Sequence, residues 1–173
     1  MNGVRLVEPA LSFQKAYEEM VQEWCEAGET MVPFVLRLEP KPFSTLIEKM
    51  NDYKEGINIP ETFVPHSTYW LMNKDNVMLG AVNIRHRLNE YLLKKGGHIG
   101  YGVRPSAREN GYAKMMLRLA LEKARDLGLE RVLVTCDKDN TASSKTIVSN
   151  HGKLESEFVE DNGNVVLRYW ITL

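Results

Sequence analysis

The sequence predicts an α/β fold: a central, mostly antiparallel sheet flanked by helices. Three features predict it: short apolar segments separated by turn residues, long segments with helical apolar spacing, and one strand–helix–strand succession. Strands joined by a crossover helix run parallel, whereas strands joined by a short turn run antiparallel. We therefore expect a mixed sheet in which one strand pair is parallel.

Length and composition favour a single domain over residues 1–173. The 22 Lys and Arg residues nearly balance the 23 Asp and Glu residues, so the net charge is -1 and gives no global attraction for nucleic acid or an anionic membrane. No apolar run reaches the length of a membrane span, and the first residues lack a signal-peptide core, so we expect a cytoplasmic protein. Cys25 and Cys136 are too few for a zinc cluster, and no metal site is expected.

The first half of the chain combines helical and strand-like segments. Apolar residues recur at helical spacing from Phe13 to Trp24, and Gly28 can end that helix. Turn residues 73–76 separate two strand-like segments, which predicts a hairpin. The expected strands are residues 4–7, 68–72 and 77–85, and the expected helices are residues 13–28 and 43–53.

The second half contains the clearest helix, over residues 109–127. Its small and apolar residues share one narrow face, and Gly128 is suited to cap its end. The strand before it, residues 98–103, is ended by Pro105, and the strand after it is almost continuously apolar. The other expected elements are a strand over residues 131–136, a helix over residues 140–150, and a hairpin of residues 153–159 and 165–172.

The junction between strand 98–103 and the following helix is the best candidate for a binding site. A loop that enters a helix directs backbone N–H groups to one place, and the helix dipole favours an anion there, most often a phosphate. A P-loop is excluded because its Gly-Lys-Ser/Thr ending is absent. A dinucleotide fingerprint is excluded because Pro105 replaces its third glycine, and because Gly100 and Gly102 fall inside the strand. The pattern that remains is Arg108-x-x-Gly111-x-Ala113.

This pattern resembles the acyl-CoA-binding motif of the GCN5-related N-acetyltransferase (GNAT) family, Gln/Arg-x-x-Gly-x-Gly/Ala. Arg104-Pro105 precedes it at the usual distance, and an Asn-x-x-Ser helix start, from Asn140 to Ser143, follows the next strand. The element order fits over nearly the whole chain, and the chain is similar to one bacterial branch of the family. The resemblance implies acetyl-CoA as cosubstrate, a small-molecule or peptide amine as acceptor, and the GNAT fold.

The resemblance also implies which residues hold acetyl-CoA. The strand before the motif would carry a bulge and part from strand 131–136, which leaves an opening for the pantetheine arm. The backbone of Tyr101, Gly102 and Val103 would face the thioester carbonyl, where an N–H can stabilise an oxyanion. Asn140 would reach the pantetheine arm, assisted by Ser143 or Ser144. The diphosphate would be held by the backbone of Arg108, Glu109, Asn110, Gly111, Tyr112 and Ala113.

Two of these residues have structural alternatives. Gly111 can be a plain turn glycine, and Asn140 can be a helix N-cap, a role that asparagine fills well. The two roles of Asn140 do not exclude each other.

The catalytic residues are less defined. In many family members, a tyrosine on the helix after the Asn-x-x-Ser start acts as the acid that protonates the leaving thiolate. This chain has Ile147 at that position, so the role of the acid is vacant or filled from elsewhere. His98 is the candidate base, because its reference pKa of about 6.5 suits proton transfer at neutral pH. Tyr101 is the candidate acid or substrate contact. A structural role is an equal alternative for each, and an unchanged pH–rate profile in His98→Ala would exclude His98.

Arg85, Arg87 and Arg104 offer positive charge, either for an acidic acceptor or for the phosphates of CoA. A charge cluster at a strand edge is more often a solvated face, so both interpretations stay open.

The leading hypothesis is acetyl transfer from acetyl-CoA to a primary amine by direct attack in a ternary complex. The alternative is an acyl-CoA-binding module that has lost catalysis, which the missing tyrosine favours. A third reading makes the loop purely structural. The acceptor is not readable from the sequence, because in this family the first helices and loops such as residues 88–97 shape its site. Sheet edges and the closing hairpin offer surfaces for a homodimer.

Overall fold

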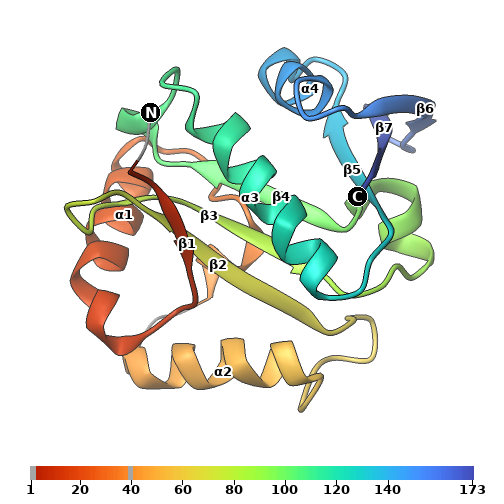
Figure 1. Ribbon diagram of the computed structural model, residues 1–173. Helices are drawn as coiled ribbons and strands as arrows, with labels where there is room; N and C mark the ends of the chain where they lie inside the picture. Colours follow the sequence, from red (N-terminus) through yellow and green to blue (C-terminus); the bar gives the residue numbers. More distant parts are fainter. Residues whose placement is uncertain (1–2, 39–40) are drawn as a thin grey trace.

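The computed structural model describes residues 3–38 and 41–173 and contains two antiparallel sheets (Figure 1). The first sheet has the strand order β1-β2-β3-β4, and the second has the order β5-β7-β6. The strands are β1 (Arg5–Val7), β2 (His66–Met72), β3 (Met78–Arg85), β4 (Ile99–Val103), β5 (Arg131–Asp137), β6 (Lys153–Val159) and β7 (Val165–Thr172). The α-helices are α1 (Gln14–Glu26), α2 (Phe43–Glu55), α3 (Tyr112–Asp126) and α4 (Thr141–Val148). Short helical turns are η1 (Leu11–Phe13), η2 (Phe34–Arg37), η3 (Leu92–Gly96) and η4 (Pro105–Ala107).

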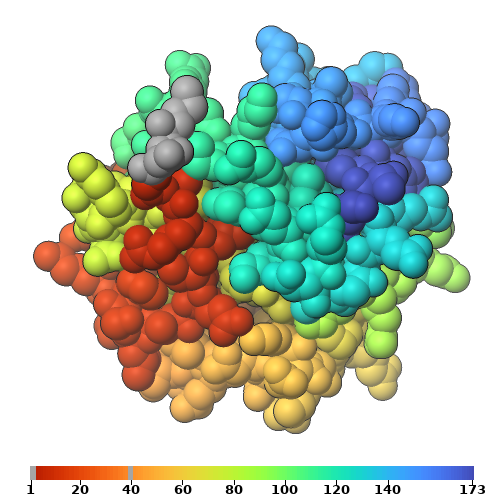
Figure 2. All heavy atoms as spheres, viewed as in Figure 1, coloured from red at the N-terminus to blue at the C-terminus, as the bar shows by residue number. Residues whose placement is uncertain are grey.

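The first sheet is covered by helices on both faces (Figure 1). Successive side chains of a strand point to opposite faces, so β2 contributes Leu71 to the core under α3 and Trp70 to the core under α1 and α2. This double coverage explains why every residue of β2 is buried. In the space-filling view, α3 (teal) crosses the centre of one face, between the N-terminal segment (red) and the C-terminal region (blue) (Figure 2).

The expected strand–helix–strand unit is β4-α3-β5, but its two strands belong to different sheets. They meet near their beginnings, where the backbone N–H of His98 donates to the carbonyl of Leu133 at 2.7 Å. The N–H of Leu133 in turn donates to Nδ1 of His98 at 2.9 Å. Along the rest of both strands, the described residues form no β4–β5 ladder. The expected parallel pairing of β4 and β5 is therefore limited to the contact between His98 and Leu133, after which the two strands separate.

Two local expectations are corrected by the structure. The bulge expected in β4 is absent, because all five residues of the strand pair in regular register with β3. Gly102 instead permits close packing: a Cβ there would collide with the carbonyl of Val32 and lie 2.9 Å from the Trp24 ring. The long helix starts at Tyr112 and not at residue 109, because Glu109 and Gly111 have left-handed φ angles of 63° and 76° that interrupt helical geometry.

The other elements confirm the predicted order, with boundary shifts of a few residues. The hairpin strand β2 begins at His66, and the connection over residues 88–97 contains the turn η3. The mixed α/β fold class predicted from the sequence is thus confirmed. Within the described part of the chain, no helix has the length and apolar character that a membrane span needs.

Candidate active site between the diverging strands

A cleft of about 800 Å³ opens where β4 and β5 part. Its walls come from β4, the loop before α3, the start of α4 and the segment that follows α1. Ten predicted cofactor residues line it: Tyr101, Gly102, Val103, Arg108, Glu109, Gly111, Tyr112, Ala113, Asn140 and Ser143. Asn110 does not line the cleft, because its amide turns back and donates to the carbonyls of Arg108 at 2.8 Å and Ala107 at 3.3 Å. These hydrogen bonds of the Asn110 amide stabilise the conformation of the loop on the side away from the cleft.

The loop before α3 presents unpaired backbone donors to the cleft. The N–H of Met115 donates to the carbonyl of Gly111, which is the first turn of the helix. Tyr112, Ala113 and Lys114 lie within that first turn, so their N–H groups lack helical acceptors, and all three residues line the cleft. A Cβ on Gly111 would meet nothing within 4 Å, so this glycine is required by its left-handed backbone and not by crowding.

The side chain of Arg108 is tied to the segment after α1. Its Nη1 donates to Glu29 at 2.9 Å, its Nε donates to the carbonyl of Val103 at 3.2 Å, and its guanidinium lies 5.8 Å from the Trp24 ring centre. The hydrogen bond from Arg108 holds the pKa of Glu29 below its usual range. Arg108 therefore contributes its backbone to the loop and uses its side chain as a structural link. Trp24 and Glu29 line the cleft and were missed by the sequence reasoning.

Arg104 is also engaged in structure. Its Nε donates to Glu23 at 2.6 Å, and Glu23 accepts two further hydrogen bonds from Ser106, from the backbone N–H and from Oγ. Burial raises the pKa of Glu23, but these hydrogen bonds outweigh it and leave the pKa below its usual range. This pairing joins α1 to η4, and it removes Arg104 from the positive cluster considered for ligand binding.

The free edge of β4 supplies further donors. The N–H of Arg85 donates to the carbonyl of His98, and the N–H of Arg104 donates to the carbonyl of Leu79. Backbone groups alternate between the two edges of a strand, so the N–H groups of Gly100 and Gly102 also face β3. The N–H groups of Tyr101 and Val103 consequently face the opposite edge, where none of the described strands pairs with β4 and the cleft begins.

Tyr101 directs its side chain toward α4. Its hydroxyl lies 3.4 Å from Oγ of Ser143, and both residues line the cleft. Burial raises the pKa of Tyr101 to about 12, so the hydroxyl stays protonated at ordinary pH. Ile147, at the position where the family resemblance implied a tyrosine, is fully buried in the core. The phenol of Tyr101, carried by β4, thus reaches the start of α4 in this cleft.

Asn140 fills the N-cap role. Its Oδ1 accepts a hydrogen bond from the backbone N–H of Ser143 at 3.0 Å. Asn140 also lines the cleft, so the two roles considered for it are compatible.

His98 is not among the residues that line the cleft. Its Nδ1 accepts the Leu133 N–H, and its ring packs 6.1 Å from the ring of Trp170. Burial, followed by the nearby charges of Arg85 and Arg131, lowers the pKa of His98 to about 4. This geometry supports a structural role in joining β4 to β5 and does not support proton abstraction in the cleft.

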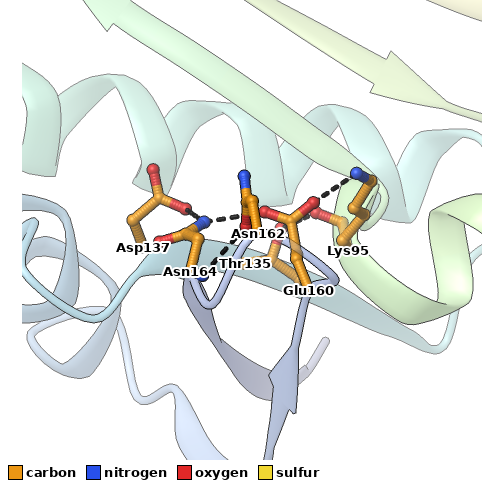
Figure 3. Close-up of polar contacts among 6 residues, drawn as sticks. All are labelled: Lys95, Thr135, Asp137, Glu160, Asn162 and Asn164. Atoms are coloured by element: carbon orange, nitrogen blue, oxygen red, sulfur yellow. Dashed lines mark hydrogen bonds and ion pairs between the residues drawn. The ribbon is translucent and has the colours of Figure 1, made fainter.

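A polar network includes three residues that line the cleft, Lys95, Thr135 and Asp137 (Figure 3). Lys95 pairs with Glu160, and Nδ2 of Asn164 donates to Glu160 at 2.7 Å and to Asp137 at 2.8 Å. Oγ1 of Thr135 donates to the carbonyl of Lys95 at 2.8 Å. The network ties η3 and the end of β5 to the β6–β7 turn. Among the described residues, no His, Cys, Asp or Glu side chains form a group suited to a metal ion.

The chain belongs to the acetyltransferase (GNAT) family. The model of that family matches residues 16–148, which include the loop, α3 and the start of α4. This membership confirms the family and the acyltransferase class expected from the sequence. No curated protein sequence matches the chain.

Solved structures share the fold at low sequence identity. RimL, a ribosomal L7/L12 alpha-N-protein acetyltransferase in complex with coenzyme A, is 18% identical, with a TM-score of 0.72 over 100% of this chain and 96% of its own. MccE, a microcin C7 self-immunity acetyltransferase in complex with acetyl-CoA and AMP, is 16% identical, with a TM-score of 0.68 over 100% and 94%. The spermidine/spermine N-acetyltransferase SpeG from Vibrio cholerae is 14% identical, with a TM-score of 0.67 over 99% and 95%.

Proposed function

We propose that the protein transfers an acetyl group from acetyl-CoA to an amine acceptor by direct attack in a ternary complex. One observation carries the proposal: the unpaired N–H groups at the start of α3 and those on the free edge of β4 open onto the same cleft. Elements from α1 to β7 line that cleft, which supports treating residues 1–173 as one catalytic domain.

The cleft suits an extended acyl-CoA molecule. The N–H groups of Tyr112, Ala113 and Lys114 would hold the diphosphate at the positive end of the α3 dipole. The pantetheine arm would follow the opening between β4 and β5, within reach of Asn140 and Ser143. Structures of this fold with coenzyme A or acetyl-CoA bound, those of RimL and MccE, support this choice of cosubstrate.

The reacting carbonyl would lie beside the free edge of β4. The N–H of Tyr101 or of Val103 would stabilise the negative oxygen that develops as the neutral amine attacks. A C–N bond forms, the C–S bond breaks, and the phenol of Tyr101 gives its proton to the departing thiolate. The proton released by the attacking amine leaves to solvent, from which Tyr101 is reprotonated. His98, the other candidate catalytic residue, has no part in this scheme, because it does not line the cleft.

Two measurements test the proposal. Acetyl-CoA should raise the melting temperature, because a ligand that binds only the folded state stabilises it, by about 2.7 kcal/mol at 100 times its Kd. Thiol release should then depend on an added amine. Stabilisation without turnover of any amine would indicate the alternative, a binding module without catalysis. No stabilisation at millimolar acetyl-CoA would contradict both.

A further inference from the structure

Arg85, in β3, stands apart from the other partly buried arginines. The side chains of Arg104 and Arg168, which are 13% and 18% exposed, pair with Glu23 and Glu155. Arg85 is likewise only partly exposed, yet none of the described carboxylates pairs with it. Its recorded hydrogen bond is from Nη1 to the carbonyl of Gly96, at 3.3 Å. A guanidinium has five N–H donors, so most of its capacity is unused.

The surroundings of Arg85 are polar and hold other unused groups. His66 lies directly opposite Arg85 in the β2–β3 register, and Asn83 precedes Arg85 by two residues on the same face. Nε2 of His66 and Oδ1 of Asn83 are buried, and neither has a hydrogen-bond partner among the residues that the structure describes. Buried polar groups are normally paired, so these two groups and the guanidinium form a polar cluster with spare hydrogen-bonding capacity.

The hydrogen-bond pattern defines what His66 can offer. Nδ2 of Asn83 lies 3.3 Å from the carbonyl of Ser67, which only accepts, so this end of the amide is the nitrogen. The same nitrogen donates to Nδ1 of His66 at 2.8 Å. Burial, then the charges of Arg85 and His86, lowers the pKa of His66 to about 4, so the ring is neutral. Its proton is therefore on Nε2, which is an unused donor.

Gly100 connects this cluster to the cleft. It pairs with Asn83 in the β3–β4 register, and it lines the cleft. A Cβ at Gly100 would lie 3.1 Å from Nη1 of Arg85, so the missing side chain leaves the guanidinium open toward β4. The side chain of Tyr101, the next residue, points to the opposite face of the sheet. Arg85 itself does not line the cleft, so an acceptor would reach it past Gly100, while the Tyr101 face would serve the departing thiolate.

From this arrangement we infer that the acceptor carries a carboxylate, which binds Arg85 while its amine faces the thioester beside β4. The inference rests on the proposed acetyl transfer and names the class of its acceptor. A guanidinium fork matches a carboxylate with two parallel hydrogen bonds. The ring of Phe34 lies 6.0 Å from the guanidinium and 5.4 Å from His66, and it excludes water from one side. A single positive charge beside a neutral histidine balances a monoanionic carboxylate better than a phosphate dianion.

The test compares paired amines that differ only in a carboxylate and its neutral amide. The pairs are an α-amino acid and its α-amide, an ω-amino acid and its amide, and a short peptide with a free or an amidated C-terminus. Wild type should favour the carboxylate member of at least one pair. Arg85→Gln should reduce kcat/KM for that member by about 100-fold, because it removes one partner of an enclosed charge pair. The amide member should change by less than threefold.

Three controls make the result specific. Arg118→Gln removes the same charge from an exposed position on α3, outside the cleft, and should leave both members unchanged. Arg85→Lys keeps the positive charge but loses the guanidinium fork, so its kcat/KM for the carboxylate member should lie between those of wild type and Arg85→Gln. This variant keeps the inference testable if Arg85→Gln folds poorly. The stabilisation of each variant by acetyl-CoA should match that of wild type, because Arg85 does not line the cleft in which acetyl-CoA would bind.

Two results would overturn the inference and leave acetyl transfer standing: equal use of amide and carboxylate members by wild type, or an equal loss on both in Arg85→Gln. The inference would also be overturned if no carboxylate-bearing amine is acetylated while acetyl-CoA still binds. Absence of stabilisation by acetyl-CoA would instead contradict the proposed function itself.

Discussion

The hydroxyl of Tyr101 lies 3.4 Å from the hydroxyl of Ser143, so strand β4 and helix α4 meet at a polar pair in the cleft. Burial raises the pKa of Tyr101 to about 12, which keeps a proton on the phenol. Ile147 leaves α4 without the tyrosine expected at that position. A phenol on β4 is thus available for the same task from the neighbouring element.

Tyr101→Phe removes this proton donor and keeps the ring. We expect kcat to fall by about 100-fold, within the range typical of general acid catalysis, with little change in acetyl-CoA binding. Steady-state kinetics and melting curves with acetyl-CoA measure the two effects separately. Tyr91→Phe is the matched control, because Tyr91 is exposed and outside the cleft. An unchanged kcat in Tyr101→Phe would show that the thiolate is protonated by another group.

The loop before α3, where we propose that the cofactor binds, was predictable as a loop because its signal is local. Gly111 and the start of the helix lie within a few residues of each other, and turn chemistry and helix patterns act at that range. The expected helix start was three residues early, since Glu109 takes a left-handed φ that is uncommon for a residue with a side chain.

The partners of the loop were not predictable in this way. Glu29 and Arg108 are 79 residues apart, and no spacing rule relates two such positions. His98 was expected on the strand before the loop but lies just before β4, which begins at Ile99, and its lateral contact with Leu133 depends on how two sheets meet. The polar cluster around Arg85 likewise forms only when β2, β3 and β4 come into register.

Gly111 offers a direct test of the cofactor loop. Gly111→Ala places a side chain on a left-handed residue and should cost about 1 kcal/mol of stability. Gly128→Ala does the same at a φ of 81°, also with nothing within 4 Å of the new Cβ, but after the far end of α3. Both variants should lose similar stability, while only Gly111→Ala should weaken acetyl-CoA binding by several-fold. Equal affinities in calorimetric titration would reduce Gly111 to a turn glycine.

The two roles of Asn140 can be separated by two substitutions. Asn140→Ala removes the hydrogen bond to the Ser143 N–H and should cost about 1 kcal/mol of stability, as N-cap losses do. Asn140→Asp keeps the accepting oxygen, so its denaturant midpoint should match that of wild type. It loses the amide N–H, however, and should bind acetyl-CoA more weakly if Asn140 also donates to the pantetheine arm. Unchanged affinity in Asn140→Asp would leave only the capping role.

His98 should make the free energy of unfolding depend on pH in the acidic range. Its pKa is about 4 in the folded chain, below the ordinary histidine value of about 6.5. Between these values the unfolded chain binds more protons, so stability is full above about pH 6.5 and is lost as the pH falls toward 4, by at most about 1.4 kcal/mol per pH unit for one histidine. His66, whose pKa is also about 4, should add a similar loss.

His98→Asn tests this assignment and the role of His98 together. Oδ1 of the asparagine can accept the Leu133 N–H in place of Nδ1, so the contact between β4 and β5 can persist. Urea unfolding between pH 4 and 7 should then show a smaller loss of stability than wild type, because one histidine with a lowered pKa is removed. His151→Asn, at an exposed histidine beyond α4, should leave it unchanged. Because His98 does not line the cleft, the pH–rate profile of His98→Asn should follow wild type. An unchanged acid loss combined with abolished turnover would instead identify His98 as the base.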